Sequence, residues 1–448
     1  MRKAGLRTLL GLVEALRPAL TEPGFERLLV MLLGWVRVTG RHTVTEALVA
    51  AGVSGRVHHE AFHRFFSRGS WSPDEWGRRL FRLVLQLLPE GVALRVALDD
   101  TLAPKKGPKV FGIGIHLDAV RSTRRHRVFC FGHVWVVLAV LVRVPFSQRT
   151  WALPVLLRLY RNEKDCTKSG VPHRKKTELA REMLEILMGW FDGRIELVAD
   201  SAYCNDTVAH ELPERIVFIG AMRLDAVLTA PPPPRKSRQR GRPRIRGELL
   251  RKPEALADDG RTPWKTCTAT LYGKQRVVHY KDCLAQWYRA LGPRLVRVII
   301  AREEKGSFRF RIFFSTDISL PVASVLEAYQ RRWAIEVCFR DLKQLLGFAD
   351  SPARKQAAVE RTAPFVAYLY TLLLLWASRS TAALRLAAPP RRLWYLRKSA
   401  LSFEDILRAA RLASLASPIS DLLPPYGNFR NSIRRSLARA QQNFKFAA

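Results

Sequence analysis

The chain has 448 residues, which is long enough for two or three domains that each bury an apolar core. It carries 75 Lys and Arg against 39 Asp and Glu, a formal net charge of +36. Such an excess attracts polyanions, so nucleic acid is the expected partner. An anionic membrane surface would call for a lipid anchor or a basic amphipathic helix, and the sequence shows neither, so no membrane association is expected.

The six cysteines are scattered and have no zinc-type spacing. They predict reduced thiols in a cytoplasmic protein. The apolar runs are shorter than the roughly 18 residues that a membrane span needs, and are interpreted as core elements. Charged residues interrupt the first apolar stretch, so no signal-peptide core is expected there.

Residues 1–90 are predicted to form a helical DNA-binding domain. Two short helices, 43–53 and 57–66, flank a Ser54-Gly55 turn, as in a helix-turn-helix. Simple bundle packing explains the same pattern equally well. His58, His59 and His63 have helical spacing, but without a fourth ligand a metal site is the less favoured interpretation.

From Val92 the apolar period changes from helical to alternating, which predicts a strand that ends in Asp99-Asp100-Thr101. By parity Asp100 shares the face of Leu98, whereas Asp99 lies on the opposite face. A carboxylate on an apolar face is costly unless it is paired or bound to a metal. Asp100 is therefore the stronger candidate for a functional carboxylate.

Residues 91–220 show the pattern of a mixed α/β core. The expected elements are strands 110–117 and 128–142 in an antiparallel meander with the first strand, helix 175–190, strand 195–199, helix 201–212 and strand 217–220. Strand 195–199 ends in Asp200. Taken alone, an Asp at this position is more often a helix N-cap or a turn residue than a ligand.

Residues 221–318 are predicted to be a β-rich insertion with strands at 264–272, 275–280, 295–303 and 307–316. Its first part is a strongly basic segment after four prolines. Within it, Arg240-Gly241-Arg242-Pro243 is similar to an AT-hook, in which arginines enter the minor groove. A solvated basic linker that binds only the DNA backbone is the alternative.

The stretch from Tyr329 to Lys343 carries the most specific pattern of the chain. On a helical wheel, Tyr329 and Lys343 each lie about 20° from Glu336 and Arg332 lies about 40° from it, so all four share one face. The remaining faces are mostly apolar. A single Glu and Arg at this spacing usually form a weak surface pair, but four aligned polar residues with Trp333 among them favour a functional site.

These four residues and their gaps resemble the Y-R-E-K signature of bacterial insertion-sequence DDE transposases. The resemblance implies an α/β fold: an RNase H-like mixed sheet flanked by helices, in two parts at 91–220 and 319–390. A helical N-terminal domain precedes it, the β-rich insertion lies before the Glu-bearing helix, and 391–448 is a basic C-terminal helical tail.

The resemblance also implies the site. Asp100, Asp200 and Glu336 would be the catalytic, metal-binding carboxylates, and Tyr329, Arg332 and Lys343 would contact DNA. We also predict DNA contacts for Trp333, Lys105, Lys106, Arg240 and Arg242. Oxygen ligands without Cys or His favour Mg²⁺, or Mn²⁺, over zinc, and the two-ion mechanism of phosphodiester chemistry fits three carboxylates.

The implied function is that of a DNA transposase that hydrolyses element ends and transfers strands, and the family resemblance permits a hairpin intermediate. The implied partners are terminal inverted repeats, target DNA and a second copy of the chain, in the bacterial cytoplasm at the nucleoid. Two alternatives stay open: a transposase-derived DNA-binding protein without catalysis, and an RNase H-like nuclease without strand transfer.

Overall fold

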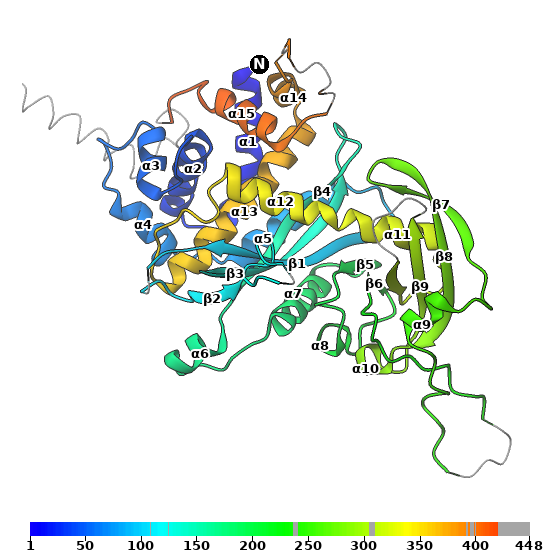
Figure 1. Ribbon diagram of the computed structural model, residues 1–448. Helices are drawn as coiled ribbons and strands as arrows, with labels where there is room; N and C mark the ends of the chain where they lie inside the picture. The colour runs from blue at the N-terminus through cyan, green and yellow to red at the C-terminus, as the bar shows by residue number, and fades with distance from the viewer. Residues whose placement is uncertain are drawn as a thin grey trace, which may run out of the picture.

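The computed structural model describes residues 1–107, 109–123, 125–235, 241–303, 310–390, 393–394, 398 and 400–419 (Figure 1). Arg240 and the arginines near the C-terminus, from Arg430 to Arg439, lie outside the described residues. The DNA contact predicted for Arg240 therefore stays a prediction.

The N-terminal region is helical, as its apolar spacing predicts. Its elements are α1 (Arg2–Glu14), a 3₁₀ turn (Arg17–Ala19), α2 (Glu22–Arg37), α3 (Val44–Ala50), α4 (Glu60–Ser67) and α5 (Pro73–Leu85). The side chains of Thr21 and Thr43 accept hydrogen bonds from backbone N–H groups and so begin α2 and α3. α4 buries Phe62, Phe65 and Phe66, and the Phe66 ring packs edge-on against Phe365.

A single ten-stranded mixed sheet runs through the molecule (Figure 1). Its strands are β1 (Leu94–Pro104), β2 (Gly114–Leu117), β3 (Phe129–Arg143), β4 (Thr150–Tyr160), β5 (Ile195–Ala199), β6 (Ile216–Ala221), β7 (Lys265–Leu271), β8 (Lys274–Gln286), β9 (Leu295–Glu303) and β10 (Arg311–Ser315). The order is β2-β3-β1-β5-β6-β10-β9-β8-β7, and β4 pairs with β3. β1 is antiparallel to β3 and parallel to β5, which confirms the predicted RNase H-like mixed sheet.

The strands of the predicted insertion continue this same sheet. β10 pairs antiparallel with β6, and β9, β8 and β7 follow outward. The insertion therefore covers the edge that β6 would otherwise expose. The local pattern of each strand could not show this, because pairing between β6 and β10 joins residues about ninety positions apart in the chain.

Two local predictions in the core were wrong. β4 was not predicted, although it forms a long hairpin with β3 and is almost wholly buried. Its apolar residues do not alternate with polar ones, because helices cover the sheet on both sides. The helix expected at 201–212 is only the short α8 (Asp206–Ala209).

The remaining helices flank the sheet (Figure 1). They are α6 (Glu163–Ser169), α7 (Lys176–Trp190), α9 (Pro253–Asp258), α10 (Tyr288–Leu291), α11 (Val322–Arg331), α12 (Trp333–Leu345), α13 (Gln356–Arg379), α14 (Thr381–Ala387) and α15 (Phe403–Ser414). α11 and α12 lie across one face, and α7 lies on the other. The described part of the predicted C-terminal tail, α15, packs against α1, α2 and α14.

α13 connects the sheet to the N-terminal helices. It contacts β4, α1, α4 and α5, and its Tyr368 and Thr371 side chains donate hydrogen bonds to carbonyls of β4. Among the described helices, α13 is long and apolar enough to cross a membrane, but 89% of its most apolar window is buried inside the protein. It is the central core helix of this structure, as its apolar run predicts.

The contact between α5 and β4 depends on Gly77. A Cβ atom at this position would lie 2.1 Å from the carbonyl oxygen of Val155. We expect Gly77→Ala to lower the free energy of unfolding by about 1 to 3 kcal/mol, because a backbone oxygen cannot move aside cheaply. Gly11→Ala is the control: it has open space around it in α1 and is expected to stabilise by roughly 1 kcal/mol. Thermal unfolding measures both, and a stabilised Gly77→Ala would contradict this packing.

Candidate active site

Two acidic residues lie where the pairing of β1 with β5 ends. β1 itself runs on to Pro104, past the end predicted for it at Asp99-Asp100-Thr101. The parallel register pairs Leu98 with Ala199, so the next residues, Asp99 and Asp200, point to the same face of the sheet. Burial raises the pKa of Asp99 to about 7, against the attraction of Arg332 and with a further contribution from the charge of Asp200. Burial also raises the pKa of Asp200. Both carboxylates therefore lie where negative charge is poorly solvated.

Arg332 joins Asp99 to Glu336, the glutamate of the Y-R-E-K pattern. Its Nη1 donates to Asp99 Oδ2 at 2.7 Å, and its Nη2 donates to Glu336 Oε1 at 2.8 Å. The Arg332 side chain is 12% exposed, and its buried Nε has no hydrogen-bond partner among the described residues. The guanidinium is thus the counter-ion of two carboxylates that are 237 residues apart in the chain.

The Y-R-E-K residues do not lie on one unbroken helix. α11 ends at Arg331 and α12 begins at Trp333, so Arg332 stands at the junction. The Tyr329 ring nevertheless lies 5.6 Å from the Arg332 guanidinium and 4.8 Å from the Phe313 ring of β10. Tyr329, Arg332 and Trp333 also line a cavity of about 360 Å³ together with Phe310 and Phe313. The extended sheet therefore brings aromatic side chains up to the helix junction.

Lys343 lies at the far end of α12. Burial lowers its pKa, and the charges of Asp118 and Asp100 act in the opposite direction. Of the other predicted DNA contacts, Trp333 is 51% exposed, and Lys106 and Arg242 are exposed. Lys105 is engaged within the protein: its Nζ donates to the carbonyl oxygens of Ala349 and Ser351, and burial lowers its pKa to about 8.

Asp100 points away from Arg332. Its carboxylate accepts hydrogen bonds from the Tyr203 hydroxyl at 2.8 Å and from Lys176 Nζ at 2.7 Å. These residues line a separate cavity of about 430 Å³ at the start of α7. Tyr203 is almost fully buried, and its pKa is raised by burial and by the neighbouring Asp100.

The parity argument that favoured Asp100 assumed that β1 has one apolar face. In the structure helices cover both faces, and Val96, Ala97 and Leu98 are all buried. Parity therefore places Asp99 and Asp100 on opposite faces of β1, but it does not show which of them is the functional carboxylate. The structure brings Asp99 into contact with Arg332, while the role of Asp100 as a ligand stays a prediction.

Tyr203 and Lys176 are contacts that sequence reasoning missed. No local pattern distinguishes them, because each meets Asp100 only through the packing of its segment against β1. The His58 and His59 rings stack, and the His63 ring of α4 packs edge-on against His59. Within the described residues, no group of three or more His, Cys, Asp or Glu side chains is already arranged to hold a metal ion.

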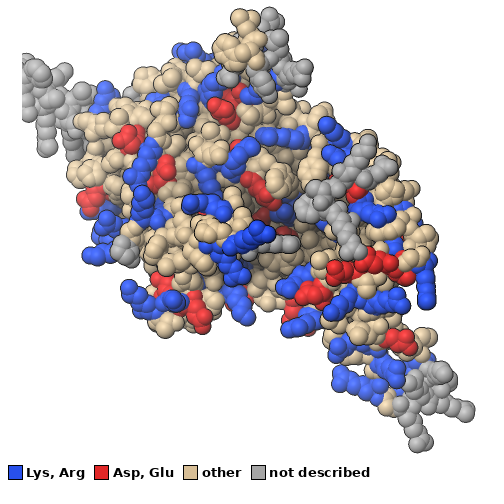
Figure 2. Space-filling view, viewed as in Figure 1, with Lys and Arg blue, Asp and Glu red and all other residues tan. Residues whose placement is uncertain are grey.

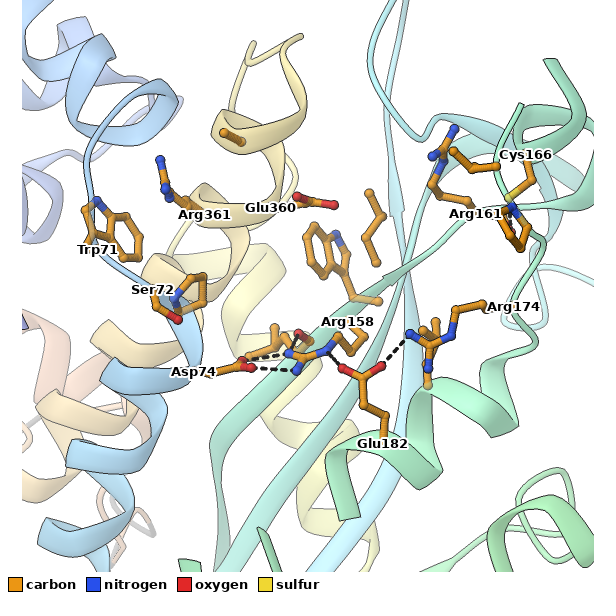
Figure 3. Close-up of a pocket in the computed structure, with 18 of the residues that line it drawn as sticks. Trp71, Ser72, Asp74, Arg158, Arg161, Cys166, Arg174, Glu182, Glu360 and Arg361 are labelled. Atoms are coloured by element: carbon orange, nitrogen blue, oxygen red, sulfur yellow. Dashed lines mark hydrogen bonds and ion pairs between the residues drawn. The ribbon is translucent and has the colours of Figure 1, made fainter. Parts of the chain in front are cut away.

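A larger cavity, of about 630 Å³, lies elsewhere, at the junction of the N-terminal helices with β4 and α7 (Figure 3). None of the predicted site residues lines it. Its centre is Arg158, which pairs with Asp74 of α5 and Glu182 of α7, and Arg174 pairs with the same glutamate. These charges are matched to one another, so this network holds α5 against the core.

The chain thus has an acidic site at the strand ends of a mixed sheet, faced by a helix that carries Glu336 and basic residues. The chain belongs to the DDE superfamily endonuclease family, whose sequence profile matches residues 15–276. That match includes Asp99, Asp100 and Asp200 but ends before α11 and α12. No curated protein matches the chain.

Among solved structures, the chain is similar to the piggyBac transposase in a cryo-EM structure of its synaptic complex with hairpin DNA. The identity is 11%, the TM-score is 0.43, and the alignment covers 93% of this chain and 76% of that one. A similarity of this size carries no conclusion about function.

Proposed function

We propose that the chain is the transposase of a bacterial insertion sequence of the Y-R-E-K type, which cleaves DNA at element ends and transfers the freed strand. The observation that carries the proposal is the Arg332 guanidinium, which links Glu336 of α12 to Asp99 of β1. Membership of the DDE superfamily endonuclease family and the net charge of +36 support it. Figure 2 shows Lys and Arg spread over the face that carries α11 and α12, densest across its middle.

The carboxylates suit a divalent cation by their chemistry. They offer only oxygen donors, which Mg²⁺ and Mn²⁺ prefer, and the raised pKa values of Asp99 and Asp200 show negative charge that lacks full compensation. Asp200 and Glu336, with Asp99 or Asp100, would hold the ions; we propose two. Bound there, the ions would supply activation of the attacking oxygen and stabilisation of the leaving one.

Arg332, directly before α12, and Lys343 within it would position the DNA. Arg332 neutralises carboxylates in this structure, and its planar donors also match a phosphate group. Lys343 lies eleven residues further on, roughly 16 Å along the axis of α12, so the two cations are suited to phosphates that are not adjacent. The Tyr329 hydroxyl would donate a hydrogen bond to one of them. A homodimer assembled on DNA, in the bacterial cytoplasm at the nucleoid, completes the proposal and rests on the family resemblance.

The test is cleavage of a linear DNA that carries the element's own ends, with Mg²⁺ or with EDTA. Glu336→Gln is expected to lower the cleavage rate at least about 1,000-fold, because an amide cannot supply the charge that a catalytic divalent ion requires. Glu185→Gln, an exposed carboxylate of α7, is the matched control and is expected to cut like the parent.

The products discriminate between the proposal and its alternatives. Nicks at the ends followed by joined strands support a transposase, and a hairpin product would identify that pathway. Cleavage without joining supports a nuclease. Tight, salt-sensitive binding with no cleavage by the parent protein would overturn the proposal in favour of a DNA-binding protein without catalysis.

A further inference from the structure

The hairpin of β2 and β3 extends beyond the rest of the sheet and exposes an apolar face. β1 pairs with β3 as far as Gly132, and the Lys105 N–H donates to Phe131 O, so the two residues before Phe131 pair with β2 alone. The register places Ile115 opposite Phe131 and Leu117 opposite Phe129. These four side chains are 48 to 60% exposed, whereas His116 between them is buried. Two cross-strand pairs on one face therefore form a continuous exposed apolar strip.

The tip of this hairpin is strongly basic. Arg121, Arg125 and Arg127 are all exposed. The one carboxylate of the described tip, Asp118, accepts hydrogen bonds from the backbone N–H groups of Val120 and Arg121. Asp118 therefore forms the turn and pairs with none of the three arginines.

The tip is held in shape by its own hydrogen bonds. The Asp118 N–H donates to Val128 O, and the Val128 N–H donates to the Ser122 hydroxyl. The Thr123 N–H donates to His126 O, and the His126 N–H donates to the Thr123 hydroxyl. A hairpin ordered in this way presents its arginines with less conformational entropy to lose on binding.

The hairpin begins close to the candidate active site. Asp118, at the end of β2, lies near enough to Lys343 for its charge to act on that ammonium group. The start of the basic tip therefore lies near Lys343 of α12. A DNA backbone that passes Lys343 would run toward the hairpin.

We propose that residues 114–123 and 125–132 form a DNA-binding arm, in which Arg121, Arg125 and Arg127 bind phosphates of duplex DNA and the exposed apolar strip lies against sugars and base edges. The proposal deepens the proposed function and rests on it for the identity of the DNA. The charge of the arm favours DNA over a second copy of the chain as its partner. A second copy docked symmetrically on this face would bring two sets of the same arginines together, whereas DNA supplies the opposite charge.

The experiment measures the affinity of the full-length protein for duplex DNA by fluorescence anisotropy over a range of salt concentrations. Arg121→Ala/Arg125→Ala/Arg127→Ala is expected to weaken binding at least about 10-fold near physiological salt. It is also expected to make the slope of log Kd against log salt shallower by about 2 to 3, since each phosphate contact contributes about 0.9. The loss is expected on element ends and on unrelated duplexes alike, because phosphate contacts do not read sequence.

Two further variants complete the design. Arg194→Ala/Arg289→Ala/Arg385→Ala removes the same charge from exposed positions just before β5, in α10 and in α14, and is expected to leave the slope unchanged. Phe129→Ala/Phe131→Ala is expected to weaken binding about 10-fold with the slope of the parent, because it removes apolar contact surface but no charge. Thermal unfolding checks that every variant is folded.

The arm is overturned if the tip variant binds DNA with the affinity and slope of the parent. It is also overturned if the phenylalanine variant lowers self-association in analytical ultracentrifugation and leaves DNA affinity unchanged, since the strip would then hold a second copy. Cleavage is scored separately. A parent protein that binds through the arm but never cuts would defeat the proposed function and leave the arm standing.

Discussion

Arg332→Met is expected to lower the free energy of unfolding by about 3 to 5 kcal/mol in metal-free buffer. The substitution removes the buried cation that compensates Asp99 and Glu336 and leaves their charges unpaired. If these carboxylates hold a divalent ion, millimolar Mg²⁺ should recover much of the loss. The melting temperature of the variant should therefore rise more with Mg²⁺ than that of the parent, since an ion that binds only the folded state stabilises it.

Arg158→Met is the matched control. Arg158 is similarly buried and also pairs with two carboxylates, Asp74 and Glu182, but lies in the structural network of Figure 3. It is expected to destabilise by a similar amount with no recovery in Mg²⁺. An equal response of both variants to Mg²⁺ would show that the ion does not bind at the strand ends.

Asp99→Asn is expected to change how stability depends on pH. The pKa of Asp99 is raised from 3.8 to about 7 in the folded protein. Between these values the folded state binds more protons than the unfolded state, so the stability of the parent falls as pH rises, and the loss persists above pH 7. The shift corresponds to on the order of 4 kcal/mol. Asp99→Asn removes this slope and should unfold at higher temperature than the parent at pH 8 in EDTA.

Melting curves between pH 4 and pH 8 measure this effect, with the exposed Asp192→Asn as the control that keeps the slope of the parent. A slope unchanged in Asp99→Asn would contradict the burial of this carboxylate. Cleavage assays then show which aspartate of β1, Asp99 or Asp100, binds the metal ion. If Asp99 is the ligand, Asp99→Asn loses cleavage and Asp100→Asn retains it; the reverse result would show that Asp100 leaves Lys176 and Tyr203 to bind the ion.

The sequence by itself determined the elements whose signals are local. The helical N-terminal region, the strand that ends in Asp200, helix α7 and the strands of the insertion all follow from apolar period and turn residues, which act between near neighbours. The α/β class follows from their order. The pattern of Tyr329, Arg332, Glu336 and Lys343 is visible in the sequence because its spacing lies within a few helical turns, and its assignment as a Y-R-E-K signature stays a prediction.

The tertiary structure decided everything that depends on which segments pack together. β4 was not predicted because a strand that is buried on both faces does not alternate between apolar and polar residues. The choice between Asp99 and Asp100 could not come from parity, because covering both faces of β1 removes the contrast between an apolar and a polar side. The pairing of β6 with β10, the Arg332 contact to Asp99 and the Tyr203 contact to Asp100 join distant positions, and such contacts form only when the whole sheet is assembled.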